Sequence, residues 1–372
     1  MILMLTEDEI AERASAALLG ALVADAATMG LHWVYNQSEI AELVSQRSAA
    51  GFPEFLTPPA SKYYNYESGA FSPYGDELLP VAQFLADHGK MDDVEFSKFL
   101  AAYYNTYPGR LNKSSKGMAA AVTDGGKTGA QAGSSDPDDN QANGMVKVPA
   151  LILRYAARPG LSMAVSKAVG VQQSNAAARD AAVAVAVVLE KVVMGAPVKD
   201  ALMWAATHVQ QTGARSSGQQ LISHAVQDTL QHALKQAATA ESELRKRRSG
   251  PSAAAGGGLL QIGLANGLSC SLPGALANAV AGAALAEPLA TAIGGGGGND
   301  GQARFRAAIR ANMLAGGDSA ARAIVIGALL AAEGGIDSIP PEWIARTSRY
   351  AEVATLAARV AARRRRTPSS AE

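Results

Sequence analysis

Alanine supplies most of the apolar character of this sequence, and this limits what the chain can fold into. Hydrophobic residues make up 48% of the 372 residues, yet aromatic residues make up only 5%. Alanine is the strongest helix former, because its side chain loses no rotational entropy in a helix. No segment alternates apolar and polar residues as a strand does. The sequence therefore predicts an all-α protein with a compact multi-helix core of small residues.

Charge and cysteine content exclude several classes of protein. The chain has 33 basic and 33 acidic residues, whereas nucleic-acid binders carry a basic excess, so we expect no nucleic-acid partner. Cys270 is the only cysteine, which excludes an intramolecular disulfide and a cysteine zinc site. Met1–Leu5 is too short for a secretory signal, and no stretch of about 20 lipid-like residues is evident. We therefore expect a cytoplasmic protein without a membrane span; the oligomeric state stays open.

Helical patterns recur over residues 1–362, which we interpret as one domain. Thr6 and Glu9 form a capping box that should open a helix reaching about Met29. Further helices are expected over 76–88, 93–105, 150–155, 161–170, 176–193, 198–210, 218–235, 301–315, 319–334 and 341–362, with irregular connections over 51–75 and 109–149.

Two segments interrupt these patterns. Residues of about 241–258 combine four basic residues with serine, alanines and glycines, and residues of about 292–303 contain five consecutive glycines. Both compositions are typical of flexible insertions. The four arginines Arg363–Arg366 open a tail, 363–372, that we expect to be disordered.

Acidic residues beside apolar helices mark candidate sites, and each also has a structural explanation. Asp25 interrupts an apolar helix, so it either bonds to a neighbouring helix end or belongs to a site. Asp76 and Asp318 each precede an apolar helix and could be N-caps. The glycines Gly316 and Gly317 allow another group to approach the backbone closely.

A polar run, Asp136–Met145, has three acids and three amides in ten residues. It could ligate a hard cation or form a solvated loop. Tyr63, Tyr64 and Tyr66 could stack on an adenine or anchor their loop on the core. We expect Arg322 on a helix surface.

The order and wording of these motifs resemble the ADP-ribosylglycohydrolase family over about residues 10–345. The segment Gly20–Gly30 is similar to the first-helix motif of the family, and Asn143-Gly144-Met145 to its central motif. The runs Ser72–Asp76 and Asp139–Met145 resemble the branch that contains the J-type crystallins of jellyfish eyes. The C-terminal signature is similar at Cys270–Leu276, Phe305–Asn312, Gly316–Ser319, Ile326–Ala332 and Ile339–Trp343.

The resemblance implies an all-α orthogonal bundle that hydrolyses the C1″ bond of ADP-ribose conjugates with two magnesium ions. The transition state of such a reaction is oxocarbenium-like. Metal ligands of the family come from a Thr-Asp-Asp-Thr motif and an Asp-x-Asp-Thr motif, which align with Tyr74–Glu77 and Asp318–Ala321 here. This implies Asp76, Glu77 and Asp318 as metal ligands, although Gly75 and Ala320 have lost their acids.

His32 falls where the family has its catalytic glutamate, so the resemblance implies His32 and Asp76 as catalytic residues. Two functions follow. The chain is either a hydrolase with one magnesium ion, to which Asp138 or Asp139 could add a ligand, or a protein that keeps the fold and the nucleotide pocket but has lost hydrolysis. In the second case it binds ADP-ribose or serves structurally as crystallins do; the expected cofactor is thus one magnesium ion or none. A hydrolase needs Asp76 and Asp318 to converge near His32. The expected partner is ADP-ribose or an ADP-ribosylated substrate, and the expected ligand-binding residues are Asp25, Asn143, Gly144, Gly316, Gly317 and Ser319.

Overall fold

The computed structural model describes residues 5–48, 51–208, 222–246, 258–292 and 300–366. These residues fold into helices without a strand, which confirms the all-α prediction; a single β-bridge joins Gln141 and Ser271. The first half of the chain comprises α1 Glu7–Thr28, η1 Met29–Leu31, α2 Gln37–Arg47, α3 Pro73–His88, α4 Asp93–Thr106, α5 Lys113–Thr123, η2 Gly129–Ser135, η3 Ala142–Lys147, α6 Val148–Tyr155, α7 Leu161–Gly170, α8 Ala176–Val193 and α9 Val198–Thr207. The second half comprises α10 His224–Lys246, α11 Leu259–Asn266, α12 Gly274–Ala284, α13 Ala286–Ala292, α14 Gly301–Ala315, α15 Ser319–Gly334, η5 Ile336–Ser338, α16 Pro341–Arg346 and α17 Tyr350–Arg366.

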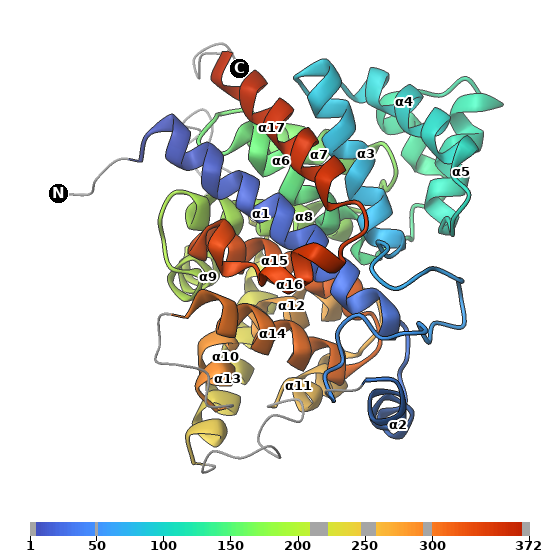
Figure 1. The fold of residues 1–372 in the computed structure, drawn as a ribbon. Coiled ribbons are helices and arrows are strands. Elements are labelled where there is room, and N and C mark those ends of the chain that lie inside the picture. The colour runs from blue at the N-terminus through green and yellow to red at the C-terminus, as the bar shows by residue number, and fades with distance from the viewer. Residues whose placement is uncertain (1–4, 49–50, 209–221, 247–257, 293–299, 367–372) are drawn as a thin grey trace.

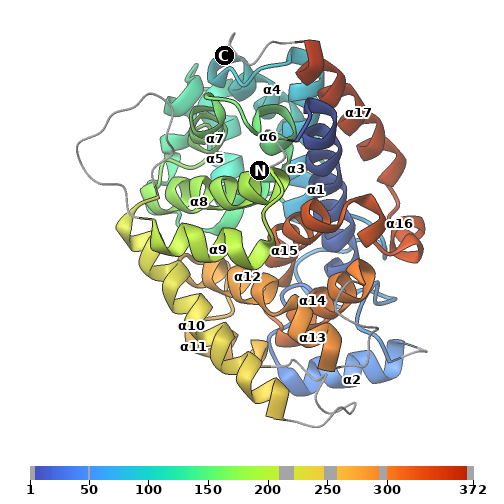
Figure 2. The ribbon, with the colours of Figure 1, turned by 90° about the vertical axis from the view of Figure 1, so that its left-hand side faces the viewer.

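Helices α1 and α15 cross at the centre of the fold, and the other helices surround them (Figures 1 and 2). Both are apolar on nearly every side, as expected of helices buried on all sides. Glycines let them approach closely: a Cβ on Gly20 would lie 2.7 Å from the carbonyl oxygen of Gly327. Small residues are therefore required where α1 and α15 cross.

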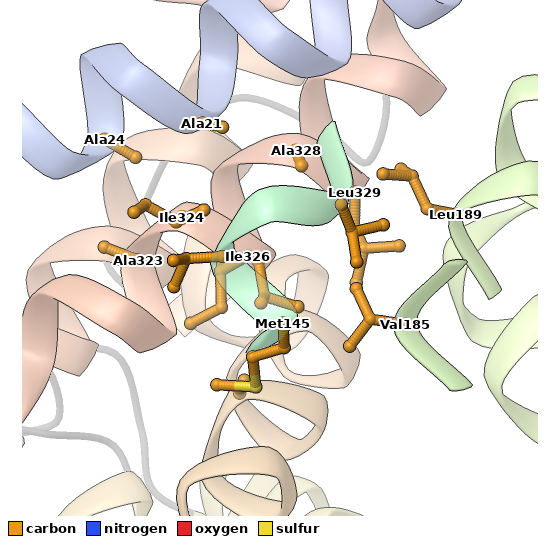
Figure 3. Close-up of a cluster of buried hydrophobic side chains, with 14 of the residues drawn as sticks. Ala21, Ala24, Met145, Val185, Leu189, Ala323, Ile324, Ile326, Ala328 and Leu329 are labelled. Atoms are coloured by element: carbon orange, nitrogen blue, oxygen red, sulfur yellow. The ribbon is translucent and has the colours of Figure 1, made fainter. Parts of the chain in front are cut away.

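The core around α15 interleaves small and branched side chains (Figure 3). Ala21 and Ala24 of α1 face Ile324 and Ala328 of α15, and Val185 of α8 packs from the other side. Close packing of this kind makes even one added methyl group costly.

By length and hydropathy, Glu7–Leu31 could cross a membrane, contrary to the expectation from the sequence. However, 94% of its most apolar window is buried inside the fold, as in the core helix of a globular domain. The bent pair α12 and α13 passes the same test only if it is counted as one segment.

Most predicted helices are found, and the capping box at Thr6 and Glu9 is present. The connection expected over 109–149 is wrong in part, because α5, η2 and η3 form there. Asn112 caps α5 by accepting a hydrogen bond from the Ser115 N–H, at 2.7 Å. The helix expected over 341–362 is split into α16 and α17.

The predicted insertions are shorter than expected. Residues 241–246 belong to α10, where Glu241 pairs with Arg245 four residues later, at 2.7 Å. Asp300 caps α14, which begins at Gly301. The remainder of each insertion, 247–257 and 293–299, lies outside the described residues.

The disordered tail predicted to begin at Arg363 is wrong for its first four residues. Helix α17 continues through Arg366, because its arginines find partners on the body of the protein. Arg364 is fully buried and pairs with Glu7 at 2.6 Å, and Arg365 pairs with Asp8 at 2.7 Å. Residues 367–372 lie outside the described part of the chain.

Candidate functional site

His32 and Asp318 meet where the end of α1 contacts the start of α15. His32 Nδ1 accepts a hydrogen bond from the Ala320 N–H, at 3.2 Å. The ring proton therefore resides on Nε2, which faces Asp318 Oδ1 at 3.6 Å. Asp318 occupies the N-cap position of α15, as the sequence suggested, but its side chain makes no capping bond, and His32 caps the helix instead.

Burial sets the protonation of this pair. It lowers the pKa of His32 well below its usual value, and the charge of Arg322 adds to the effect. Burial also raises the pKa of Asp318 to about 6, against the charge of Arg322 and hydrogen bonds from Tyr74 and Trp33. Near pH 7 the imidazole is neutral and the carboxylate is ionised. Both side chains are fully buried, so the pair is shielded rather than open to a ribose.

Arg322 is buried, and its expected position on a helix surface is wrong. Its Nε donates to Asn312 Oδ1 at 2.7 Å, and its Nη2 donates to the Gly316 carbonyl at 2.6 Å. The guanidinium thus satisfies acceptors at the C-terminal end of α14 that the helix leaves open.

Gly316 and Gly317, which we expected to contact a ligand, contact the protein itself. Their φ angles are +80° and +70°, which favour glycine. Gly317 exchanges backbone hydrogen bonds with Trp33 and Val34, at 2.8 and 2.7 Å. Ser319 is also buried. Contact of these three residues with a ligand stays a prediction.

Asp25 bonds to the start of a neighbouring helix, the structural alternative that we had considered. Its two oxygens accept hydrogen bonds from the backbone N–H and the hydroxyl of Ser72, the N-cap of α3, at 2.8 and 2.5 Å. Burial raises the pKa of Asp25 to about 7. A Cβ on Gly75 would overlap this carboxylate, so Asp25 occupies the space beside position 75.

Glu77, a predicted metal ligand, is buried and bonded entirely to protein donors. Lys147 brings an ammonium group to 3.5 Å from Glu77 Oε2, and its side chain is fully buried. Burial lowers the pKa of Lys147, and Glu77 opposes this effect. The donors to Glu77 are Asn112 at 2.8 Å, Ser115 at 3.2 Å, Asn143 at 2.9 Å, Lys147 at 3.5 Å and Gln172 at 3.2 Å.

The central motif supports this network. Asn143 donates to Glu77, while Gly144 lets η3 pack on α8, since a Cβ there would lie 2.9 Å from the Ala178 carbonyl oxygen. Asp139 accepts hydrogen bonds from Ser114 and Gln173 and is buried. Asn143 and Gly144 thus have structural roles in this network, and their contact with a ligand stays a prediction.

Asp76 lines a cleft of about 510 Å³, and neither His32 nor Asp318 is among the residues that line it. Ser72 caps α3, so Asp76 is not the N-cap. Tyr107 donates a hydrogen bond to Asp76 Oδ2, and Arg349 Nη1 lies 3.5 Å from Oδ1. Burial raises the pKa of Asp76 to about 6, which the Tyr107 hydrogen bond and the Arg349 charge oppose. The cleft is lined by Tyr66, Glu67, Ala70, Phe71, Asp76, Tyr103, Thr106, Tyr107, Pro108, Gly109 and Arg349.

The tyrosines of the 51–75 connection divide between the two roles that we considered. Tyr64 anchors the loop, because its hydroxyl donates to the Met29 carbonyl at 3.1 Å. Tyr66 lines the cleft, and its hydroxyl lies 3.0 Å from that of Tyr107. Tyr103, Tyr107 and Arg349 also line the cleft, and the sequence motifs gave no signal for them, because they lie outside every motif and meet Asp76 only in the folded chain.

The described residues do not fit the predicted magnesium centre. Magnesium needs an octahedron of oxygens that are free to bind it. Asp76 is engaged by a tyrosine and an arginine, and Glu77 by five donors. Asp318 Oδ1 accepts from the Trp33 Nε1–H at 3.2 Å, so that only the single buried oxygen Oδ2 is left without a hydrogen-bond partner among the described residues. Within the part of the chain that the structure describes, no group of three or more His, Cys, Asp or Glu side chains could hold a metal ion.

A larger cavity, about 1070 Å³, lies away from all these residues, among α9, α10, α13 and α14. Four of its charged side chains form two ion pairs, Lys199 with Glu241 at 2.9 Å and Arg304 with Glu333 at 2.7 Å. The smaller cleft is the better candidate, because Asp76 has a raised pKa and lies among aromatic rings.

Comparisons with known proteins agree with this fold. The sequence model of the family described as ADP-ribosylglycohydrolase matches residues 6–369. Crystallin J1A and Crystallin J1B of Tripedalia cystophora are 34% and 31% identical over 103 residues, which is 28% of this chain; the matched part spans about 30% of the length of these relatives. A solved structure described as an ADP-ribosylglycohydrolase-related protein complex matches with a TM-score of 0.61 and 16% identity, covering 95% of this chain and 99% of that one.

Proposed function

Because the chain belongs to the ADP-ribosylglycohydrolase family, we propose that it binds an ADP-ribose-type nucleotide in the Asp76 cleft, and that it does so without magnesium. The observation that carries this proposal is the composition of the cleft, in which aromatic walls surround two carboxylates, Asp76 and Glu67, and one guanidinium, Arg349. Small-molecule sites combine apolar walls with a few converging polar groups in this way.

Each part of such a ligand has a matching group in the cleft. The rings of Tyr103 and Tyr107 stack on each other with centroids 5.8 Å apart and offer a flat face to a base. Asp76 can accept hydrogen bonds from ribose hydroxyls. Arg349 carries a guanidinium that suits phosphate oxygens, although Glu352 also binds it, at 2.7 Å.

Independence from magnesium is supported by the partners of the other two predicted metal ligands, Glu77 and Asp318. An ammonium group, Lys147, already lies next to Glu77, and Asp318 faces His32 in a shielded pair. A divalent cation would have to displace these protein partners. We therefore expect the ligand to be held by side chains alone.

Calorimetric titration of ADP-ribose tests where the ligand binds. We expect the wild-type protein to bind and Tyr103→Ala to weaken binding about tenfold or more, because base stacking contributes about 1–3 kcal/mol. Lys199→Ala, in the larger cavity, is the control and should bind as the wild type does. Equal loss in both variants, or loss only in Lys199→Ala, would overturn the assignment to the Asp76 cleft. An absence of binding to the wild-type protein would favour a structural role, as the names of the crystallin relatives suggest.

Hydrolysis is the second candidate function, and Asp76 is the observation that favours it. A carboxyl group with a pKa of about 6 can give its proton to a leaving group as the C1″ bond breaks, while water adds to C1″. Release of ADP-ribose from conjugates by the wild-type protein, but not by Asp76→Asn, would establish this activity. Release that persists in Asp76→Asn would exclude this role for Asp76.

A further inference from the structure

Arg110 stands out among the charged residues near the cleft. It is exposed, in the connection between α4 and α5, and its guanidinium lies over the ring of Trp33, 4.8 Å from the centroid. The ring of Tyr63 lies 5.6 Å away. Among the described residues, no carboxylate lies at ion-pair distance from Arg110, and no acceptor bonds to its guanidinium. Ring faces alone therefore hold the group.

The platform under Arg110 is fixed in place. Trp33 has φ of +64°, which is unfavourable for a bulky residue and persists only where its surroundings enforce it. Its backbone N–H donates to Gly317 and its Nε1–H donates to Asp318, at 2.8 and 3.2 Å. The Tyr63 ring stands at 85° to the indole. The two rings are thus nearly perpendicular, and a cation can contact the faces of both.

Arg110 is also tied to the wall of the cleft. Its backbone N–H donates to the Tyr66 hydroxyl at 2.9 Å, and that hydroxyl lies 3.0 Å from the hydroxyl of Tyr107. The two residues before it, Pro108 and Gly109, line the cleft. Arg110 is therefore positioned at the rim of the cleft.

We propose that Arg110 binds the diphosphate of the nucleotide in the Asp76 cleft, an inference that rests on the proposed function. Cation–π attraction holds a guanidinium without using any of its five N–H donors. Two oxygens of a diphosphate can accept hydrogen bonds from two of these N–H donors at once, an arrangement that is common where a guanidinium binds a phosphate. Because the rings already fix the guanidinium, binding costs little additional side-chain entropy.

Calorimetric titrations of ADP-ribose and adenosine into wild-type protein, Arg110→Gln and Arg110→Lys test this assignment. Loss of charged hydrogen bonds predicts binding of ADP-ribose about 10- to 100-fold weaker in Arg110→Gln. Adenosine, which lacks phosphate, should bind all three proteins alike. Arg110→Lys should retain part of the ADP-ribose affinity. Arg179→Gln, which removes an exposed arginine of α8, is the matched charge control and should behave as the wild type does.

The outcomes separate this inference from the proposed function. If the wild-type protein binds ADP-ribose and Arg110→Gln binds it equally well, the role of Arg110 is wrong and the cleft assignment stands. Equal weakening of adenosine and ADP-ribose would also contradict the diphosphate contact, because it would show a general disturbance of the cleft. If the wild-type protein binds neither ligand, the proposed function fails, and this inference fails with it.

Discussion

Lys147 and Glu77 bring opposite charges together in the interior, and their pairing joins α3 to η3. Both side chains are almost completely buried, and Lys147 also donates to the Asn143 carbonyl at 2.9 Å. Removing one member of a buried ion pair leaves the other charge buried without a partner. This lowers stability by far more than the intact pair contributes to it.

We therefore predict that Lys147→Met lowers the free energy of unfolding by about 3–5 kcal/mol, because Glu77 loses its only cationic partner among the described residues. Urea denaturation measures this loss. The double variant Glu77→Gln with Lys147→Met should recover part of it, since no charge is then left unpaired. A loss below about 1 kcal/mol in the single variant would show that the ammonium does not hold Glu77.

Asp25 should make stability depend on pH. Its pKa is about 7 in the folded protein and 3.8 as a reference, so its stabilising contribution is complete below pH 3.8 and is lost as the pH rises through about 7. In the Asp25→Asn variant residue 25 does not ionise, so its contribution to stability does not change with pH. The destabilisation caused by Asp25→Asn should thus be largest near pH 4 and shrink by up to roughly 4 kcal/mol by pH 8. Urea midpoints of both proteins across this range measure it; a destabilisation that grows with pH would contradict the assignment.

Sequence motifs identified residues that are important but could not assign their partners. His32 and Asp318 are adjacent and buried, whereas Asp76 lines the cleft of about 510 Å³. Buried carboxylates next to helix starts look alike in sequence whether they bind a metal or a protein donor. The decisive partners, Lys147, Tyr107 and Arg349, come from other elements, and only the tertiary fold brings them close.

At the scale of helices, the crossing of α1 and α15 depends on glycines, which have no side chain, at the point where the two helices touch. A Cβ on Gly327 would lie 2.6 Å from both the Gly20 carbonyl oxygen and Ala24 Cβ. By contrast, a Cβ on Gly170, at the end of α7, would meet its nearest neighbour, Ala130 Cβ, at 3.9 Å.

Gly327→Ala should therefore destabilise the protein by about 1–3 kcal/mol through overpacking. Gly170→Ala is the matched control and should change stability by no more than about 1 kcal/mol, in the stabilising direction. Thermal or urea unfolding of both variants measures the difference. Similar stability in the two variants would show that the crossing can open to accept a methyl group.

Helix boundaries followed from the sequence where apolar periodicity is clear, as in α7, α8, α14 and α15, although only α8 and α14 among these have a side-chain cap. They failed where helices are held by distant partners. Helix α5 has a polar, glycine-containing sequence, and the arginines at the end of α17 look like a solvated tail until Glu7 and Asp8 lie beside them. Local propensity carries no information about such contacts.

For the whole molecule, the sequence predicted the fold better than it predicted the metal centre. The helical architecture is similar to that of a solved structure at 16% identity and a TM-score of 0.61. Alanine content predicted an all-α fold, because alanine is the strongest helix former and its small side chain lets helices pack closely. The predicted metal centre depended on three carboxylates converging, and in this chain each of them contacts protein groups instead.

The most direct test of the account is calorimetric titration of ADP-ribose into metal-free protein, first in EDTA and then with excess magnesium. We predict dissociation constants that agree within about twofold, because Lys147 pairs with Glu77 and because, among the described residues, no group of three or more His, Cys, Asp or Glu side chains could hold a metal ion. Binding that is at least about tenfold tighter with magnesium, and reversed by EDTA, would contradict the account and restore the metal-assisted hydrolase.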